Sequence, residues 1–441
     1  MNLPKIDLSE ALATLLARGE PLSAAQLAAA SSKSQPSISL ALSKLGDRVH
    51  RMGAARNTRY ALKKDFSGLP AQHQLIWNGA ESSSMPMLWG QITYLYGNWL
   101  HVRSAQREWL VQSKLPWFLL PLRPQGFLGR ALARANPSLP SDPDQWSLAQ
   151  ILGSAIAQVR DPSGAFSFVH TDAGIWNAAS TTENIGAYYD RLAEQIGAGL
   201  PVGSSAAGEQ PKFLVHNSKV GECIVKFTPP RGTPFGERWH ALLSLEELAL
   251  DTLQTHGVAS ARGELIQTAK RSYLQSERFD RGVQGTQHVV AIAAIHDEFV
   301  GGAWQNWLHT SEALAKKGLI TQQELQTIAR IFAFGHYIGN TDMHSGNLSF
   351  FVDGVITPKI RLAPMYDMLP MMWRPDIHQG SLSDGPVRPQ FMAAGFEQEK
   401  GQARAWAVEF WNQAAQLDIG ADLQAAAKES ARRLSTNFAD L

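Results

Sequence analysis

The sequence predicts an α+β fold in which a β-rich segment precedes an α-rich segment, and a small basic helical domain precedes both. Three observations carry this prediction. Apolar and polar residues alternate as in strands in segments before residue 280. Apolar residues recur at helical spacing after residue 281. The first 64 residues contain ten Lys and Arg but four Asp and Glu, whereas the whole chain of 441 residues has a net charge of +1. We therefore expect three domains, at residues 1–64, 70–280 and 281–441.

Three helices and a hairpin are expected in residues 1–64. Apolar residues at positions 8, 12, 15 and 16 form one helical stripe, and Ser23 can cap a short alanine-rich helix that ends near Ala30. A third helix is expected to begin near Gln35. Residues 49–52 and 59–62 are predicted strands joined by a polar turn. Three helices followed by a basic hairpin constitute a winged helix-turn-helix domain.

Positive charge in this domain falls on the presumed recognition helix and on the wing, which favours DNA as a partner. In such a domain the third helix enters the major groove, and arginines of the wing contact phosphates. The candidates on the helix are Ser34, Gln35, Ser37 and Ser39, and those on or beside the wing are Arg48, Arg51, Arg56 and Arg59. The alternative is a domain for protein contacts whose arginines form a solvated face.

The composition is that of a globular protein expected in the cytoplasm. Hydrophobic residues make up 44% of the chain and charged residues 18%, so a large core can form. No uncharged apolar run approaches the length of a membrane span, and the N-terminus lacks the order of a signal peptide. The single cysteine, Cys223, excludes an internal disulfide and a cysteine-based zinc site.

Three further features organise the first half of the chain. Residues 63–70 are expected to form a linker. Alternation on both sides of Gly97 and Asn98 predicts a hairpin with its turn at these two residues. Residues 115–130 are expected to lead into a helix.

The polar residues of a phosphoryl-transfer site occur at residues 339–350 and shortly after them. Asp342 and Asn347 have the spacing of the catalytic Asp and the metal-binding Asn in protein kinases, and Asp367 follows a second apolar run. Such chemistry needs a carboxylate that orients the attacking hydroxyl and accepts its proton, a role that suits Asp342. It also needs oxygen ligands for Mg²⁺, which suit Asn347 and Asp367. His344 can face the nucleotide or the backbone of its own loop. An ordinary turn into a strand is the alternative for this loop.

Candidates for binding nucleotide phosphates lie upstream of this loop. Small residues at 203–208 can present backbone N–H groups to phosphates, but by themselves they favour a flexible turn, because the Walker form is absent. Lys226 ends an apolar strand about one hairpin later, where kinases place a phosphate-binding lysine; an edge-strand lysine that prevents aggregation is the alternative. The predicted helix 238–257 carries Glu246 and Glu247, either of which could pair with Lys226.

The order of the elements is that of a bilobal protein kinase. A strand at 273–281 ends where a nucleotide hinge would fall. Beyond it, helices are expected from Leu314 onward, at 323–338, at 403–417 and near 421–435. The proposed catalytic loop therefore follows the helix 323–338.

Several short motifs occur in one order along the chain: Leu115–Phe118 with Pro124–Arg130, Ser205–Lys212, Ile224–Lys226, Glu277–Arg281, Gly339–Asn347 and Ala363–Asp367. In these motifs and in their order, the chain resembles the HipA family of bacterial toxin kinases over about residues 75–435. The resemblance implies a protein-kinase-like fold of HipA type. It also implies an enzyme that uses ATP and Mg²⁺ to phosphorylate serine or threonine on a protein, with aminoacyl-tRNA synthetases as a known target class.

The resemblance also implies a role for each matching residue. These roles are Asp342 as base, with His344 beside it; Asn347 and Asp367 as Mg²⁺ ligands; Lys226 and Gly208 on phosphates; Glu277 and Phe279 at the adenine hinge; and Ser205 as the autophosphorylated serine, with Ser204 as a competitor. Two departures from the family stand out. HipA proteins usually leave DNA binding to a separate antitoxin partner, whereas a winged helix is expected here in the same chain. The phosphate loop also carries Glu209 and Pro211 where other members differ.

Three functions follow as hypotheses. The first is a serine/threonine protein kinase of toxin type that inhibits growth when active, carries an N-terminal DNA-binding domain and has a possible antitoxin partner. The second is a DNA-binding transcription regulator whose kinase-like part senses a ligand without catalysis. The third is a small-molecule kinase, because antibiotic kinases share the Asp-x4-Asn loop.

Overall fold

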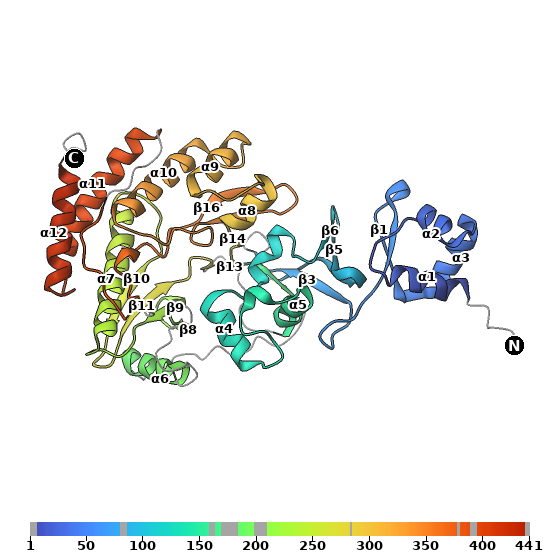
Figure 1. Cartoon of the computed structure of the whole chain (residues 1–441), viewed down its shortest axis with the longest axis horizontal. Coiled ribbons are helices and arrows are strands. Elements are labelled where there is room, and N and C mark those ends of the chain that lie inside the picture. Colours follow the sequence, from blue (N-terminus) through green and yellow to red (C-terminus); the bar gives the residue numbers. More distant parts are fainter. Residues whose placement is uncertain are drawn as a thin grey trace. The chain divides into compact units, whose positions relative to one another are not determined.

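The computed structural model describes residues 7–79, 86–157, 164–168, 184–197, 210–282, 285–376, 380–388 and 395–436. Contacts divide the chain into two compact units (Figure 1). The first unit comprises Met1–Pro124 and Ser138–Gly174, and the second comprises Gln125–Pro137 and Ile175–Leu441. The predicted domain at residues 70–280 thus contributes to both units.

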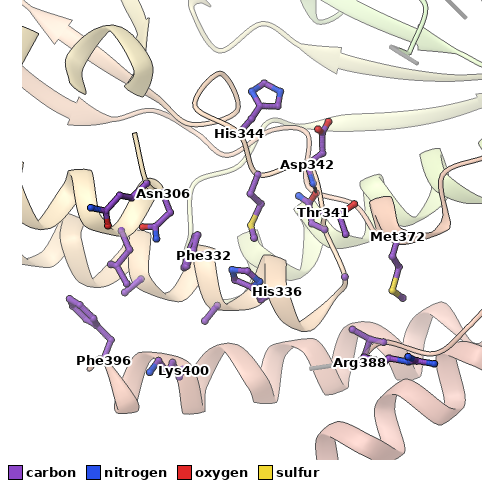
Figure 2. Close-up of a pocket in the computed structure, with 18 of the residues that line it drawn as sticks. Asn306, Phe332, His336, Thr341, Asp342, His344, Met372, Arg388, Phe396 and Lys400 are labelled. Atoms are coloured by element: carbon purple, nitrogen blue, oxygen red, sulfur yellow. Dashed lines mark hydrogen bonds between the residues drawn. The ribbon is translucent and has the colours of Figure 1, made fainter. Parts of the chain in front are cut away.

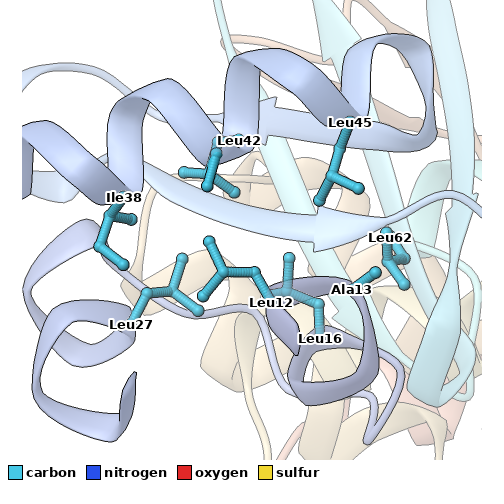
Figure 3. Packing of buried hydrophobic residues seen from close by; sticks show 9 residues of the cluster. Leu12, Ala13, Leu16, Leu27, Ile38, Leu42, Leu45 and Leu62 are labelled. Atoms are coloured by element: carbon cyan, nitrogen blue, oxygen red, sulfur yellow. The ribbon is translucent and has the colours of Figure 1, made fainter. Parts of the chain in front are cut away.

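The first unit begins with three helices and a two-stranded sheet, at the positions that the sequence predicts. These are α1 (Leu8–Leu16), α2 (Ala24–Ser31), α3 (Gln35–Leu45), β1 (Val49–Met52) and β2 (Arg59–Leu62). Ser23 caps α2 in a capping box with Gln26. Leu12, Leu27 and Ile38, one from each helix, are almost completely buried against one another (Figure 3). The assignment of these elements to the winged helix-turn-helix class stays a prediction.

A five-stranded antiparallel sheet completes the core of the first unit. Its order is β6 (Glu108–Gln112), β5 (Trp99–Ser104), β4 (Met87–Leu95), β3 (Gln72–Trp77) and β7 (Phe166–Phe168). Gly97 has a φ of 77° between β4 and β5, which confirms the predicted hairpin turn. The helix α5 (Leu148–Ala157) also belongs to this unit.

The expectation of a linker at residues 63–70 is wrong. The amide of Lys64 donates to the carbonyl of Tyr94 at 3.0 Å, and the Phe66 ring packs edge-on against the Tyr94 ring at 5.1 Å. Phe66 is only 4% exposed. An aromatic side chain within a polar stretch therefore holds this segment against the sheet.

The second unit contains a four-stranded antiparallel sheet with long helices beside it. The strand order is β10 (Gly263–Gln267), β11 (Ser272–Glu277), β9 (Gly221–Phe227) and β8 (Lys212–Asn217). The helix α7 (Pro234–Thr255) contacts β10 and β11. Side chains from α6 (Ile185–Gly197), among them Tyr189, pack with Phe213, Val225 and Tyr273 of the sheet. The unit also includes α4 (Gly126–Ala135), the helix expected after residues 115–130.

The rest of the second unit is mainly helical. A small pairing joins β12 (Arg281–Gly282) to β13 (Gly285–Thr286), and a three-stranded sheet has the order β14 (Val289–Ala291), β15 (Ser349–Asp353), β16 (Lys359–Leu362). The helices are α8 (Ile292–Phe299), α9 (Trp307–Lys316), α10 (Gln322–Tyr337), α11 (Glu397–Ala414) and α12 (Ala421–Ser435). The last three match the predicted helices within a turn or two.

One helix expectation needs correction. A helix was expected from Leu314 onward, but α9 begins at Trp307 and ends at Lys316. Gly318 has a φ of 68°, a left-handed conformation that turns the chain and separates α9 from α10. Within the described part of the chain, no helix is both long and apolar enough to span a membrane.

Candidate active site

Gly339 ends α10 and starts the predicted catalytic loop. Its φ is 73°, a conformation that glycine adopts without strain. A Cβ atom at this position would lie 2.4 Å from the sulfur of Met372, so a larger residue would displace that side chain. The chain then runs through the loop directly into β15, whose buried residues anchor the far end of the loop.

Asn340 joins the two carboxylates that the sequence singles out. Its side-chain oxygen accepts a hydrogen bond of 3.0 Å from the amide of Asp342, and its side-chain nitrogen donates to the carbonyl of Asp367 at 3.4 Å. Asn340 is 3% exposed. The segments that carry Asp342 and Asp367 are therefore adjacent. Sequence reasoning did not select Asn340, although it lies within the motif that drew attention to the loop.

Tyr366 makes a second connection at the other end of the loop. Its hydroxyl donates to the carbonyl of Gly346 at 2.8 Å and lies 2.6 Å from the Ser349 hydroxyl. Burial raises the pKa of Tyr366 above its usual value, so the hydroxyl stays protonated and able to donate. Tyr366, the residue before Asp367, therefore fixes the loop at Gly346, the residue before Asn347. This contact was also not anticipated.

Lys226 lies between two carboxylates. Its ammonium group is 2.5 Å from Glu246 and also pairs with Asp367. The predicted pairing of Lys226 with one of two glutamates is thus confirmed for Glu246. Glu247 instead accepts a hydrogen bond of 2.9 Å from the amide of Leu265. Lys226 and Asp367 are 141 residues apart, and their pairing brings the four-stranded sheet to the end of the predicted catalytic segment.

The three charges shift one another's pKa values. Burial opposes the charge on Lys226, but the attraction of Asp367 and Glu246 outweighs it and raises the pKa of Lys226. Burial likewise disfavours the charge on Asp367, yet Lys226 and Lys212 together lower its pKa to about 2. Glu246 is more deeply buried and lies near Asp367, so its pKa is raised despite Lys226. The two lysines therefore favour the charged form of Asp367 against the cost of its burial.

Lys212 is a further cation of the site that sequence reasoning missed. It begins β8 and lies opposite Lys226 in the register of β8 with β9. Its charge lowers the pKa of both Asp367 and Glu246. Two lysines on adjacent strands thus favour negative charge in the same region, as binding of phosphate groups requires.

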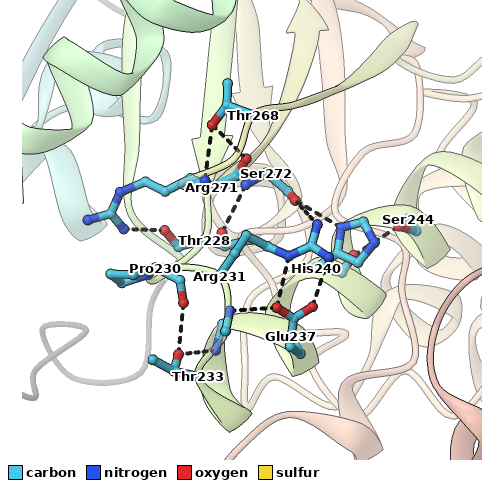
Figure 4. A network of polar contacts seen from close by, with 12 residues as sticks. Thr228, Pro230, Arg231, Thr233, Glu237, His240, Ser244, Thr268, Arg271 and Ser272 are labelled. Carbon is cyan, nitrogen blue, oxygen red and sulfur yellow. Dashed lines mark hydrogen bonds and ion pairs between the residues drawn. The ribbon is translucent and has the colours of Figure 1, made fainter.

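A polar network holds α7, the helix that carries Glu246, against the sheet (Figure 4). His240 on α7 is 2.9 Å from the Ser272 hydroxyl at the start of β11. The Ser272 amide donates to the Thr228 hydroxyl at 3.1 Å, just after β9. The strand with Lys226 and the helix with Glu246 therefore share one anchoring network.

Asn347 and His344 are oriented by the backbone of their loop. The side-chain nitrogen of Asn347 donates to the carbonyl of Asp342 at 2.9 Å, and Asn347 is 8% exposed. Its side-chain oxygen is the atom that remains for a metal ion. The Nδ1 atom of His344 accepts a hydrogen bond of 2.9 Å from the Gly346 amide, so the ring faces its own loop rather than leaving that nitrogen for a ligand. Trp307 donates to the carbonyl of His344 at 2.8 Å. A catalytic role for His344 stays a prediction.

Glu277 and Phe279 lie where the chain leaves the four-stranded sheet. Glu277 is the last residue of β11, and the Phe279 ring contacts the rings of Phe351 and Tyr366 at 5.9 and 6.0 Å. Asp280 next to them is held by two arginines, Arg278 at 2.6 Å and Arg281 at 2.8 Å. The position is that of the predicted hinge, and contact with an adenine stays a prediction. Ser204, Ser205 and Gly208 of the expected phosphate loop lie outside the described residues.

The donor atoms of the site fit a hard cation. Carboxylate and amide oxygens are the ligands that Mg²⁺ takes in proteins, and Asp367 and Asn347 supply one of each. Among the described residues, no group of three or more His, Cys, Asp and Glu has the arrangement of a metal site. A magnesium site made of one Asp, one Asn and substrate phosphates does not contain three of these residue types. The assignment of Asn347 and Asp367 as Mg²⁺ ligands therefore stays a prediction.

A cavity of about 1010 Å³ adjoins the loop on the helical side (Figure 2). Asp342, Thr341 and His344 line one part of it, and residues from α9, α10 and α11 line the rest. Lys226 and Glu246 do not line this cavity. Asp342 can therefore be approached from a side that does not contain the buried lysine.

The N-terminal arginines differ in whether their side chains already have a partner within the chain. Arg48 forms an ion pair of 2.7 Å with Glu10, and Arg59 donates to the carbonyl of Pro21 at 3.3 Å. Arg51 and Arg56 are exposed, as is Gln35 at the start of α3. The Ser34 hydroxyl caps α3 by accepting a hydrogen bond from the amide of Ser37. The hydroxyl oxygens of Ser34 and Ser37 are also 2.9 Å apart. Arg51 and Arg56 are thus the arginines best placed for an external partner.

Two family models match the chain. The HipA-like C-terminal domain matches residues 204–440, and the middle domain of YjjJ-like toxins matches residues 77–174. Toxin YjjJ of Escherichia coli (strain K12) is 32% identical over 399 residues, which cover 86% of this chain and 87% of that protein. These matches include both described units.

A solved structure has the same fold. HipA of Shewanella oneidensis MR-1, in a complex of HipA, HipB and operator DNA, aligns with a TM-score of 0.52 and 17% identity, over 79% of this chain and 94% of that chain. This likeness confirms the predicted α+β fold of HipA type. It leaves the class of the N-terminal domain untested.

Proposed function

The chain belongs to the HipA-like toxin family, and on this premise we propose that it is a kinase that transfers the γ-phosphoryl group of ATP to serine or threonine of a protein, including its own chain. Ser205 is the proposed site on its own chain, with Ser204 as the competitor. Phosphorylation of an essential protein target would inhibit growth, and aminoacyl-tRNA synthetases are the target class that the resemblance suggests.

Each residue of the site has a task in this reaction. Asp342 orients the acceptor hydroxyl and receives its proton as the oxygen bonds to the γ-phosphorus and the bond to the β-phosphate oxygen breaks. Lys226 and Lys212 neutralise phosphate charge, and Glu246 holds Lys226 in place. Asn347 and Asp367 would hold Mg²⁺, which supplies further neutralisation of the phosphates when bound.

One observation carries the proposal: Asp367 pairs with Lys226 and is joined through Asn340 to the segment of Asp342. A turn without catalytic function would not need, at its border, an ion pair between residues that are 141 positions apart in the sequence. Keeping Lys226 and Glu246 buried, with Asp367 partly buried beside them, costs stability, because ionisable groups lose hydration when they are buried. That cost is typical of functional sites, where pKa values are shifted for a purpose.

We also propose that the N-terminal helices bind DNA. The support is the net positive charge of residues 1–64 and the exposure of Gln35, Arg51 and Arg56. HipA of Shewanella oneidensis occurs in a complex with HipB and operator DNA. By analogy, an antitoxin partner is proposed for this chain, which would act together with the chain's own DNA-binding domain.

Incubation of the purified chain with γ-labelled ATP and Mg²⁺ tests the kinase proposal. Label should enter the chain itself and a protein target, and Asp342→Asn should lower transfer by a factor of about 10² or more. Asp297→Asn is the matched control, because Asp297 is exposed on α8 outside the site. Transfer that is unchanged in Asp342→Asn would contradict the proposal. DNA binding that responds to a ligand without any transfer would favour the non-catalytic regulator.

A further inference from the structure

The cavity beside Asp342 has the position of an acceptor site. Its lining comes from α9, from α10, from the first turns of α11 and from residues 383–388 (Figure 2). Asp342 lines it but Lys226 does not, so the cavity reaches the loop without including the buried lysine. We call it the acceptor groove. Its volume, about 1010 Å³, is at the upper end of what small-molecule sites occupy, about 300–1,000 Å³.

Apolar side chains cover much of the groove. They come from α10, from the loop, from Met372 and from residues 383–388, and include Phe332, Ala333, Met343 and Val387. In Figure 2, Phe332 and His336 lie in the middle of the groove, with Asp342 and Arg388 toward one end and Asn306 and Phe396 toward the other. Such a surface can hold the backbone and apolar side chains of an extended segment.

Four charged residues line the groove, and two of them are already engaged. Lys400 pairs with Glu397 at 3.0 Å, and Asp342 is committed to the acceptor hydroxyl. The other two are Glu312 on α9 and Arg388, which follows Val387. In the part of the chain that the structure describes, neither Glu312 nor Arg388 has an ion-pair partner. One negative and one positive charge are therefore left to face a bound molecule.

The wall that carries Arg388 is held firmly. The amide of Val387 donates to the Ser430 hydroxyl at 2.9 Å, and the Trp373 indole donates to the carbonyl of Gly385 at 2.8 Å. Arg238, which is 8% exposed, donates to the carbonyl of Trp373 at 3.1 Å and pairs with Asp384. Contacts on three sides hold residues 384–387, so the backbone that leads into Arg388 is anchored beside the groove.

We propose that the acceptor groove binds an extended segment of the protein substrate that has a basic side chain facing Glu312 and an acidic side chain facing Arg388. The proposal rests on the proposed kinase function, because the groove matters only if Asp342 serves a hydroxyl. Opposite charges on two separate segments that line the groove, α9 and residues 383–388, select for the sequence of the bound segment and for its direction. A neutral small molecule would use neither charge.

Peptide binding and peptide phosphorylation together test this. A positional library of fluorescent peptides, each with one central serine and one varied position, is titrated with the full chain without ATP. The same library is then used as acceptor with γ-labelled ATP. We expect Lys or Arg to be preferred at one position and Asp or Glu at another, by about fivefold each.

Charge reversal assigns each preference to its residue. Glu312→Lys should invert the preference at the basic position alone, and Arg388→Glu should invert it at the acidic position alone. Glu312→Gln should remove the preference for a basic residue without inverting it. This neutral variant keeps the test valid if Glu312→Lys fails to fold. The controls are Glu298→Lys on α8 and Lys428→Glu on α12, which reverse the charge of exposed residues outside the groove.

The outcomes separate the two proposals. Charge-dependent binding without phosphorylation would contradict the kinase function but not the groove. Self-phosphorylation together with peptide binding that ignores charge, or that responds equally in the control variants, would overturn the inference about the groove. Phosphorylation of a small molecule but of no peptide would overturn it as well.

Discussion

The hydroxyl of Tyr366 donates a hydrogen bond of 2.8 Å to the carbonyl of Gly346, which fixes the end of the loop next to Asn347. Asn340 makes the corresponding connection at the other end, between Asp342 and Asp367. The Asp367 segment and the loop therefore form one rigid structure. The position of Asp367 relative to Asp342 depends on three hydrogen bonds made by the side chains of Tyr366 and Asn340, neither of which has a proposed role in the reaction itself.

Removing the Tyr366 hydroxyl tests this connection. Tyr366→Phe should lower kcat about tenfold, because the loop loses a positioning contact, and should cost about 1 kcal/mol in the free energy of unfolding. Labelled-phosphate kinetics and urea unfolding measure the two effects. Tyr96→Phe is the control, since Tyr96 lies at a turn in the first unit. Equal activity of the two variants would show that the Tyr366 hydroxyl does not position the loop.

Loss of the Lys226 charge should destabilise the protein more than loss of the whole pair. Lys226→Met leaves Asp367 and Glu246 without their cation, and we expect the free energy of unfolding to fall by about 3 kcal/mol. The double variant Lys226→Met, Asp367→Asn removes one of these two carboxylates and should recover part of that loss. Neither variant should transfer phosphate. Equal stability of the single and double variants in urea would mean that the ion pair is not buried as described.

Asp367 should make stability depend on pH in acid. Its pKa is about 2 in the folded protein, below the usual value of 3.8, so its contribution is complete above pH 4. That contribution is lost as the pH falls toward 2 and is worth about 2 kcal/mol. The difference in unfolding free energy between the wild type and Asp367→Asn should shrink over this range. A difference that is constant from pH 5 to pH 2 would contradict the low pKa of Asp367.

Gly339→Ala should be more harmful than a matched glycine substitution. Gly339 and Gly257 have φ angles of 73° and 76°, so alanine is strained by about 1–2 kcal/mol at both. Only at Gly339 would the new Cβ collide with a side chain, that of Met372. We therefore expect a larger loss of stability for Gly339→Ala than for Gly257→Ala, and a fall in kcat for Gly339→Ala alone. Thermal unfolding and transfer assays on both variants provide the comparison.

Salt-dependent DNA binding distinguishes the N-terminal arginines. Arg51→Ala and Arg56→Ala should each weaken binding and reduce the slope of log K against log salt by about 1, because each removes one phosphate contact. Arg48→Ala should change the slope less, since Arg48 already pairs with Glu10. Titrations at several salt concentrations measure the slopes. Identical slopes for all three variants would argue that the arginines form only a solvated face.

Much of the local structure could be predicted from the sequence. The strands at 49–52 and 59–62, the hairpin turn at Gly97 and the helix at 421–435 were expected within a residue or two, because hydrophobic periodicity and turn residues are local signals. The segment 63–70 and the helix near Leu314 were misjudged. In the first segment, Phe66 packs against Tyr94, a long-range contact that a largely polar stretch does not indicate. In the second, Gly318 follows the end of the helix and turns the chain.

The sequence by itself determined which residues can do the chemistry: the carboxylates, amide and lysine of the site are recognisable from residue type and spacing, and the family from the order of the motifs. Only the tertiary structure decided that Lys226 pairs with both Glu246 and Asp367, that Asn340 and Tyr366 hold the loop, and that Glu312 and Arg388 line one groove. Spacing along a chain specifies neighbours within a few turns of helix or one hairpin. Contacts between residues more than a hundred positions apart depend on how separate elements pack, and no local pattern encodes that packing.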